Sequence, residues 1–285
     1  MSGPDLTPIA LGDVSETLLW TLYHRALEAR RPDAVLEDPM AVALVERIDF
    51  PFAERFGEGG LAQWQAMRAR AFDERIRGFL AAHPGGTVVA LGEGLETQFW
   101  RVDDGRVRWL SVDLEEVAAL RRELLPAVPR LRTLGMSALD TGWLGEVDRG
   151  GPVLVTAQGL LMYVEPREVA RLVVACARAL PGRAMLFDAV PRWMSERSRR
   201  GGLETREGYR VPTWRWGMGR AQERQIARLP GVAGLHHVGL PRGRGAVHGA
   251  RLPAVSRAPG LRRLLPMVLE MRFAGGGGTR PGNAA

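Results

Sequence analysis

The stretch TVVALGEGLET, residues Thr87–Thr97, joins a mostly apolar run to two closely spaced glycines. The run from Thr87 to Leu91 is of the short, β-branched kind that forms a buried parallel strand. Gly92 and Gly94 follow it at once, and glycine lets the backbone turn tightly and approach a ligand. This stretch predicts a strand that leads into a ligand-binding turn.

An acid lies where a second strand is expected to end. The mainly apolar run Val107–Val112 is followed by Asp113, 21 positions after Gly92. In nucleoside-binding folds an acid at this place holds the two ribose hydroxyls. Asp113 is also a candidate N-cap for a helix over 114–125, and the two roles are compatible.

The glycine spacing argues against a dinucleotide. The dinucleotide fingerprint is G-x-G-x-x-G, but Thr97 stands at the third glycine position here. A cofactor without a pyrophosphate, such as S-adenosylmethionine, fits the shortened motif better. The alternatives are an NAD-dependent oxidoreductase and a tight turn with no ligand.

Strands and helices are expected to alternate through the rest of the chain. Beside 87–91 and 107–112, strands are predicted at 131–134, 152–157 and 184–188, a helix at 166–180, and a final antiparallel pair at 232–240 and 266–273. This order predicts an α/β fold with a doubly wound, mainly parallel, Rossmann-like sheet.

We expect three regions along the chain. Residues 1–84 form an N-terminal helical lid that caps the substrate, with Ser15 as the N-cap of its first helix. Residues 85–273 form the cofactor-binding core, with an insertion at about 193–219. The tail, 274–285, is poor in hydrophobic residues and predicted to be disordered.

Composition excludes several classes of protein. All 39 basic residues are arginines, so chemistry that needs a lysine Schiff base or a Walker-type lysine is excluded. The arginines are dispersed, so we expect no nucleic-acid partner despite the net charge of +7. His236, His237 and His248 lack metal-ligand spacing, and no metal is expected.

The cellular location follows from what the chain lacks. Cys176 is the single cysteine and lies in an apolar helical pattern, so it is interpreted as a buried hydrophobic residue. Without a disulfide, a signal peptide or a long apolar run, we expect a cytoplasmic protein with no membrane contact. The oligomeric state is unknown from the sequence.

Five motifs carry a resemblance to a known family. In chain order they are HRALEARRPDAVLEDPMA (His24–Ala41), RARAFDERI (Arg68–Ile76), LGEGLETQFWR (Leu91–Arg101), VDLEEVAALRRELLP (Val112–Pro126) and VTAQGLLMYVEPREV (Val155–Val169). Together they resemble the leucine carboxyl methyltransferase family, in particular its tetracenomycin-type polyketide O-methyltransferase branch. The resemblance spans roughly residues 15–240 and implies a class I methyltransferase that uses S-adenosylmethionine.

The resemblance also implies the cofactor contacts. Arg68, rather than Arg70, takes the position that binds the methionine carboxylate, and Ser137, Ala138 or Leu139 takes the adenine contacts. The other cofactor-binding positions are Gly92, Glu93, Gly94, Glu96, Thr97, Asp113, Leu114, Gln158 and Gly159.

Three departures from the family pattern matter, and one of them is Glu115, which replaces the usual proline or its neighbour in the acid loop. Glu96 stands where the family has Asp, which keeps the charge. Gln158 stands where the family has Glu, which removes a charge. A cofactor-binding protein of the same fold with lost or altered catalysis is therefore an alternative.

The acceptor is expected to be a small polyketide-like molecule. Tyr163, Trp193 and Trp214 are candidates for an aromatic acceptor pocket, and Tyr23 and His24 lie on the lid helix. No histidine stands in the predicted core loops to act as a base. A carboxylate, already ionised at neutral pH, is therefore favoured over a phenol as the methyl acceptor.

Overall fold

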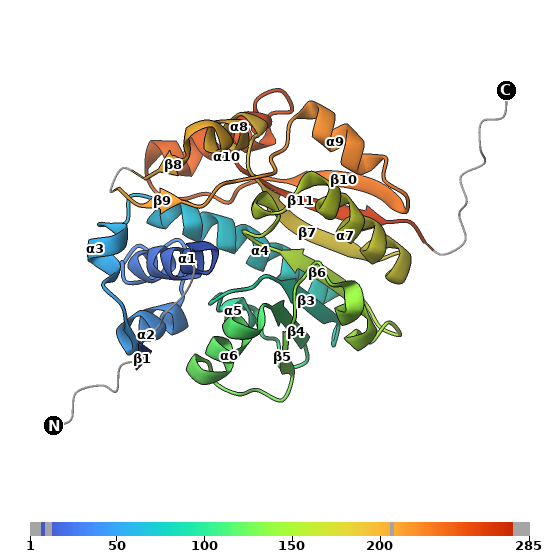
Figure 1. Cartoon of the computed structure of the whole chain (residues 1–285), viewed down its shortest axis with the longest axis horizontal. Helices are drawn as coiled ribbons and strands as arrows, with labels where there is room; N and C mark the ends of the chain where they lie inside the picture. Colours follow the sequence, from blue (N-terminus) through green and yellow to red (C-terminus); the bar gives the residue numbers. More distant parts are fainter. Residues whose placement is uncertain (1–6, 9–12, 206–207, 276–285) are drawn as a thin grey trace.

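A seven-stranded sheet forms the centre of the computed structural model, which describes residues 7–8, 13–205 and 208–275 (Figure 1). Its strand order is β10-β11-β7-β6-β3-β4-β5. The strands are β3 (Thr87–Leu91), β4 (Arg108–Asp113), β5 (Leu131–Gly135), β6 (Val153–Ala157), β7 (Ala184–Ala189), β10 (Val232–Val238) and β11 (Met267–Phe273).

The sheet is doubly wound. The five strands β3 to β7 run parallel, and β11 runs antiparallel to both β7 and β10. The chain goes from β3 outward through β4 to β5, then returns to the other side of β3 with β6. This confirms the predicted fold class, the five parallel strands to within one residue at each end, and the final antiparallel pair.

Helices lie on both faces of the sheet. The helices of the core are α5 (Gln98–Val102), α6 (Glu115–Leu124), α7 (Pro166–Ala179), α9 (Arg220–Ala227) and α10 (Leu252–Arg257). The core also contains four short helical segments, η1 (Thr141–Glu146), η2 (Leu161–Tyr163), η3 (Val247–Arg251) and η4 (Arg262–Leu264).

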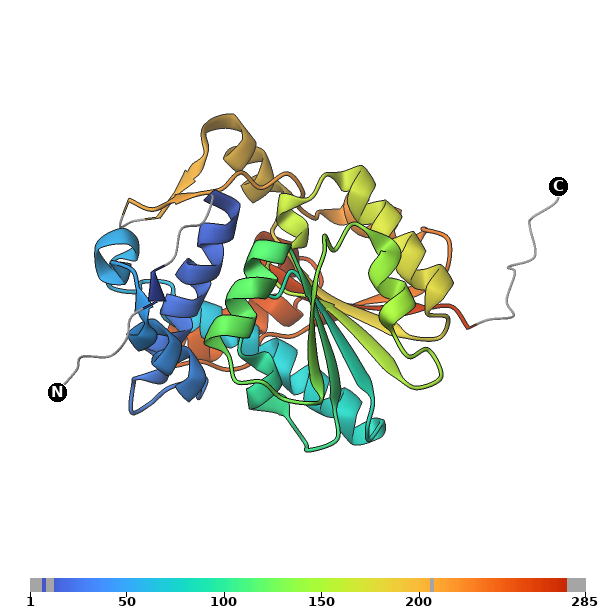
Figure 2. The same cartoon turned by 60° about the horizontal axis from the view of Figure 1, so that its bottom comes forward.

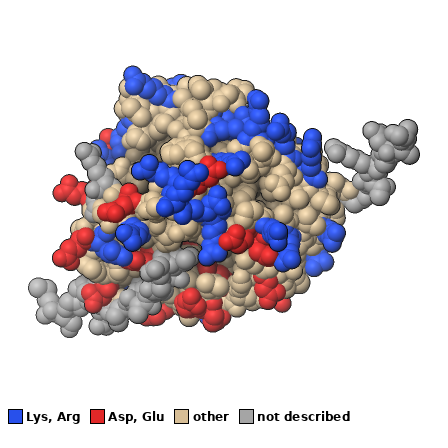
Figure 3. Space-filling view, turned by 45° about the horizontal axis from the view of Figure 1, so that its top comes forward, with Lys and Arg blue, Asp and Glu red and all other residues tan. Residues whose placement is uncertain are grey.

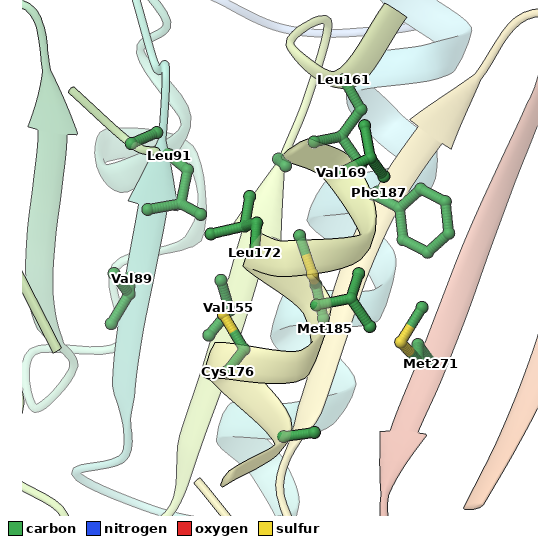
Figure 4. Close-up of a cluster of buried hydrophobic side chains, with 14 of the residues drawn as sticks. Val89, Leu91, Val155, Leu161, Val169, Leu172, Cys176, Met185, Phe187 and Met271 are labelled. Carbon is green, nitrogen blue, oxygen red and sulfur yellow. The ribbon is translucent and has the colours of Figure 1, made fainter. Parts of the chain in front are cut away.

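One face of the sheet packs against α7. Figure 4 shows Leu172 and Cys176 of this helix over Val89, Val155 and Met185 of the neighbouring strands. Cys176 is fully buried there, and burial raises the pKa of its thiol to about 12. The thiol is protonated at neutral pH and packs as a small hydrophobic group, as its position in the helical pattern predicted.

The opposite face is covered by α4 (Ala62–Ala82) and α5. The alternate strand residues Val88 and Ala90 form a second cluster with Phe72 and Ile76 of α4 and with Phe99 of α5. The strands thus present apolar side chains to both faces, which explains why they appear in the sequence as continuous apolar runs.

The N-terminal segment begins at one end of the sheet, and its last helix, α4, runs along the sheet face described above (Figures 1 and 2). It contains β1 (Thr7–Pro8), α1 (Asp13–Ala29), α2 (Pro39–Arg47), β2 (Ile48–Asp49), α3 (Phe52–Phe56) and α4 (Ala62–Ala82). The first helix begins at Asp13, two residues before the predicted N-cap, so Ser15 lies inside the helix.

The segment predicted as an insertion has little regular structure after its first helix. It contains α8 (Arg192–Gly201), β8 (Leu203–Glu204) and β9 (Arg210–Val211), followed by an extended stretch to Gly219. The backbone of Met218 pairs with Val190 and Arg192, which ties this stretch to the end of β7. The predicted disorder of the tail from residue 276 onward concerns residues outside the described part of the chain.

Candidate functional site

A cavity of about 620 Å³ opens at the carboxyl ends of the parallel strands. Gly92, Asp113, Ser137 and Gln158 enter it from the ends of β3, β4, β5 and β6. Loops that leave neighbouring parallel strands in opposite directions create such a crevice at the switch point of the sheet. The structure therefore brings these four residues together, although Gly92 and Gln158 are 66 positions apart in the sequence.

The turn after β3 has the left-handed backbone that glycine adopts without strain. Gly92 and Gly94 have φ angles of 58° and 56°. A Cβ atom would lie 2.7 Å from Leu160 at Gly92, and 3.0 Å from Leu18 at Gly94. Both glycines line the cavity, so their backbone is accessible to a ligand, and a side chain at either position would collide with a leucine of the cavity wall.

Asp113 holds this turn from the end of β4. Its Oδ2 accepts a hydrogen bond from the Gly94 amide at 2.7 Å, and its Oδ1 accepts one from the Leu114 amide at 2.9 Å. Burial raises the pKa of Asp113, against the opposing effect of these two hydrogen bonds. Each carboxylate oxygen keeps a further lone pair for a donor such as a ribose hydroxyl.

The predicted adenine-binding stretch also lines the cavity. Ser137, Ala138 and Leu139 follow β5, and Trp143 Nε1 donates to the Ala138 carbonyl at 3.0 Å. Leu114 and Leu139 are large apolar side chains of the cavity that are 43% and 39% exposed. Exposed leucines inside a cavity are suited to cover the faces of a flat apolar ring.

Arg68 lies across the cavity and is paired with an acid that the sequence analysis missed. Its Nη1 donates to Asp188 Oδ2 at 3.0 Å, and Asp188 Oδ1 accepts from the Gly159 amide at 2.7 Å. Arg68 Nε is buried without a hydrogen-bond partner among the described residues. Asp188 stands at the end of the predicted strand 184–188, so the rule that located Asp113 also applies to it.

Glu96 belongs to a buried network of charges. Its carboxylate contacts Arg101 at 2.7 Å and Arg25 at 3.1 Å. Both arginines also contact Asp38, and Arg101 contacts Asp73 as well. Burial raises the pKa of Glu96, but the guanidiniums of Arg101 and Arg25 outweigh it and lower the pKa to about 2. The network joins α1, the start of α2 and α4 to the loop after β3.

Gln158 connects this network to the cavity. Its Nε2 donates to Glu96 Oε2 at 2.8 Å. Its Oε1 is buried and has no hydrogen-bond partner among the described residues. Because both Gln158 and Glu96 line the cavity, the amide leaves one acceptor for a ligand.

Glu93 also lines the cavity but is held by other protein groups. Its carboxylate pairs with Arg121 at 2.9 Å and accepts from Trp109 Nε1 at 3.2 Å. Burial raises its pKa, against the opposing effect of Arg121. Arg121 also donates to the carbonyls of Gly94 and Glu96, so this pair supports the turn.

Four predicted residues do not line the cavity. Thr97 is fully buried and donates to Asp38 at 2.7 Å, so it belongs to the charge network. Tyr23 stacks on Phe52 and its hydroxyl donates to the Gly57 carbonyl. His24 is buried with Nδ1 2.7 Å from the Trp20 carbonyl, and Trp193 is 51% exposed.

Helical phase explains the positions of Tyr23 and Trp193. On α1, Thr17, Leu18, Trp20, Thr21 and Arg25 line the cavity, whereas the face with Tyr23 packs against α3. On α8 the cavity side chain is Met194, one residue after Trp193. The sequence placed these helices near the site but did not reveal which side of each helix faces it.

Aromatic and apolar side chains form the remaining wall. The predicted residues Tyr163 and Trp214 line the cavity, together with Trp20 and Trp64, which sequence analysis missed. Burial raises the pKa of the Tyr163 hydroxyl, with Trp214, Arg68 and Thr17 opposing it, so this group stays protonated at neutral pH. The sequence did not distinguish Trp20 and Trp64 of the N-terminal segment from ordinary core positions.

The described residues contain no group of three or more His, Cys, Asp or Glu side chains placed to hold a metal ion. No described helix combines the length and the apolar character that a bilayer crossing requires.

The sequence profile of the leucine carboxyl methyltransferases matches residues 19–177 of the 285. The chain belongs to this family. The tetracenomycin polyketide synthesis O-methyltransferase TcmP of Streptomyces glaucescens is 36% identical over 225 residues, which are 79% of this chain and 82% of TcmP. The S-adenosyl-L-methionine-dependent methyltransferase dpfgK of Gibberella zeae is 32% identical over 60% of this chain and 64% of its own length.

Solved structures share the fold of this methyltransferase at low sequence identity. A DUF574 family protein of Streptomyces avermitilis matches with a TM-score of 0.54 and 14% identity, over 88% of this chain and 97% of that protein. The CurJ carbon methyltransferase matches with a TM-score of 0.50 and 12% identity, over 91% of this chain and 70% of the other.

These matches confirm the predicted family, the class I methyltransferase fold, and the prediction of an S-adenosylmethionine-dependent methyltransferase. They support S-adenosylmethionine over NAD as the cofactor.

Proposed function

We propose that this methyltransferase transfers the methyl group of S-adenosylmethionine to a carboxylate oxygen of a flat, largely apolar, polyketide-like acid. A phenol oxygen is the second candidate acceptor. The observation that carries the proposal is the composition of the cavity. Its strand ends carry polar groups that suit the cofactor, and its outer wall is aromatic and apolar.

The residues present fit the cofactor. The glycine turn presents bare backbone to the cavity, and Asp113 has lone pairs for the ribose hydroxyls. Leu114 and Leu139 suit the adenine. Arg68 would bind the methionine carboxylate, and the unpartnered Oε1 of Gln158 would accept from the methionine ammonium. When bound, the cofactor supplies an electrophilic methyl group.

The acceptor would bind against the outer wall of the cavity, which is built by two separate segments. Trp20 and Trp64 come from the N-terminal segment 1–84, and Met194 and Trp214 come from the segment 193–219. We propose that these two segments cap the acceptor. Aromatic side chains offer large, rigid surfaces for a flat ring system, and a capped cavity keeps water away from the reacting atoms.

The ionisable groups of the cavity favour a carboxylate acceptor. Three acids of the cavity are already engaged and therefore poorly placed to act as a base. Asp188 is paired with Arg68, Glu96 with two arginines, and Asp113 with two backbone amides. A phenol, with a pKa of about 10, needs a base to take its proton, whereas a carboxylate is already ionised. Methyl transfer is an in-line displacement, so the protein's main contribution is alignment.

The name of the Streptomyces glaucescens relative supports the acceptor class. That protein is named as an O-methyltransferase of polyketide synthesis, which agrees with an oxygen acceptor on a polyketide-like molecule. The likeness extends over most of both chains.

The test uses pairs of aromatic acceptors that differ only in carrying a carboxyl or a hydroxyl group. Each is incubated with the protein and S-adenosylmethionine, and mass spectrometry detects the gain of one methyl group. Mild base then distinguishes the products, because a methyl ester releases methanol and an aryl methyl ether does not. We expect base-labile products from the acids. Base-stable products alone would show that a phenol is the acceptor.

A further inference from the structure

A second, smaller cavity of about 160 Å³ lies between α7, α8 and α9. Its polar lining includes Arg192 and Arg199 of α8, Arg215 of the extended stretch after β9, and Gln222 and Gln225 of α9. None of these residues lines the cofactor cavity. The function proposed above leaves this site without a role.

The three arginines converge on it from two elements. Arg192 and Arg199 are seven residues apart on α8, about two helical turns, and therefore lie on one face of that helix. Arg215 comes from the neighbouring stretch. No carboxylate is among the residues that line this cavity. Figure 3 shows basic side chains gathered on the surface that includes the top of Figure 1.

Two of these arginines form ion pairs with acids, and both pairs are weak. Arg192 contacts Glu196 at 2.6 Å and Arg215 contacts Glu165 at 2.8 Å, and the arginine side chains of both pairs are more than half exposed. Exposed pairs of this kind contribute little, so another anion can replace the acid. The side chain of Arg199 makes no hydrogen bond or ion pair with another residue of the described ranges 7–8, 13–205 and 208–275, although its charge helps to lower the pKa of Glu196.

Amide and apolar groups complete the lining. Gln222 Oε1 accepts a hydrogen bond from the Gly219 amide at 3.1 Å, which leaves its Nε2 as a donor. Trp216 and Ile226 are 4% and 5% exposed and form an apolar floor. The site thus offers several N–H donors and positive charges above an apolar base.

We propose that this cavity binds the phosphate group of a small phosphorylated molecule. A phosphate presents several acceptor oxygens in a compact tetrahedron, and guanidinium groups bind such oxygens in pairs with fixed geometry. The apolar floor suits the carbon atoms attached to the phosphate. Because this site does not share its lining with the cofactor cavity, the proposal is independent of the acceptor.

Occupation of the site has a structural consequence. Met194 of α8 and Trp214 line the cofactor cavity, while their chain neighbours Arg192 and Arg215 line this one. An anion between the two arginines holds α8 against the stretch around Trp214. The outer wall of the cofactor cavity is thereby made more rigid.

Calorimetric titration of the full chain with sodium phosphate, at constant ionic strength set by sodium chloride, tests the proposal. The double variant R199Q/R215Q removes two of the three charges. R108Q/R132Q is the control, because Arg108 and Arg132 are exposed arginines on β4 and β5, far along the chain from this cavity. We expect one phosphate site per chain, at least tenfold weaker binding in R199Q/R215Q, and less than a twofold change in the control.

Two further measurements keep the result interpretable. The single variant R199Q removes an exposed side chain without a described partner, so it is expected to fold and still to bind phosphate several-fold more weakly. Hydrogen exchange should show that phosphate protects the backbone amides of α8 in the unmodified protein. Absence of saturable binding, or equal weakening in the control variant, would overturn the proposal.

Discussion

Gln158 Nε2 donates a hydrogen bond to Glu96 Oε2 over 2.8 Å, and the same amide leaves Oε1 buried without a partner among the described residues. The amide is thus oriented by the acid behind it. Position 158 requires a donor toward Glu96 and offers an acceptor to the cavity. A carboxylate at position 158 would lie against the carboxylate of Glu96. The sequence did not reveal this contact.

Replacement of Gln158 by Glu should make stability depend on pH. Two carboxylates at this distance repel each other, so the pKa of the new acid should lie above its usual value of about 4.3. Such a group contributes stability below its unfolded-state pKa and loses it as pH rises through the folded-state pKa. We expect Q158E to melt several degrees further below the unmodified protein at pH 8 than at pH 5.

The control is Q158L, which loses the same hydrogen bond without gaining a charge. Its melting temperature should differ from that of the unmodified protein by a nearly constant amount over this pH range. Q158E should also favour S-adenosylmethionine over S-adenosylhomocysteine, by up to about tenfold for ~1.4 kcal/mol of added attraction to the sulfonium. A pH-independent difference for Q158E would mean that Glu96 and residue 158 are not in contact.

Removal of the Asp113 carboxylate should weaken cofactor binding. Hydrogen bonds to a charged group contribute about 1.5–3 kcal/mol each, so loss of the ribose contacts should reduce affinity at least tenfold in D113A. Calorimetry with S-adenosylhomocysteine measures the change. The matched control is D104A, because Asp104 also accepts from two backbone amides but is exposed and outside the cavity. Normal binding by D113A would leave the acid with a purely structural role.

Arg68 and Arg70 should differ sharply although they are two residues apart. Arg68 lines the cavity and pairs with the buried Asp188, while Arg70 pairs with Glu74 at the surface. We expect R68Q to lower affinity for S-adenosylhomocysteine at least tenfold through loss of the carboxylate contact, and R70Q to change it less than twofold. Similar affinities for the two variants would remove Arg68 from the cofactor site.

Acid should destabilise the protein through Glu96. The pKa of this group falls to about 2 in the folded protein from a usual value of 4.5, because Arg101 and Arg25 outweigh the effect of burial. Its stabilising contribution is complete above the usual pKa and is lost as pH falls from about 4.5 toward 2. Urea unfolding at pH 3, 4, 5 and 7 should therefore show a smaller pH dependence for E96Q than for the unmodified protein.

A control separates Glu96 from general acid effects. Glu168 is an acid on the surface of α7 that pairs with the exposed Arg171. E168Q should retain the pH dependence of the unmodified protein. Equal slopes for E96Q and the unmodified protein would show that another group dominates the acid response.

Local features of the chain determined the strands and the glycine turn. An apolar run such as Thr87–Leu91 forms a buried strand from its own composition, and Gly92 and Gly94 provide the left-handed backbone that the turn needs. Asp113 followed from its place at a strand end. Asp188 was within reach of the same reasoning, since the carboxyl ends of parallel strands meet at one edge of a sheet.

Only the tertiary structure decided which contacts the polar residues make. Thr97 lies in the predicted loop, but its hydroxyl is turned to Asp38, which is 59 residues away. Tyr23 lies on a helix near the cavity, yet the face that carries it packs against Phe52 and Phe56 of α3. The physical reason is range. Strand formation and turn geometry depend on neighbours in the sequence, whereas helical phase and the pairing of buried charges depend on how distant segments pack together.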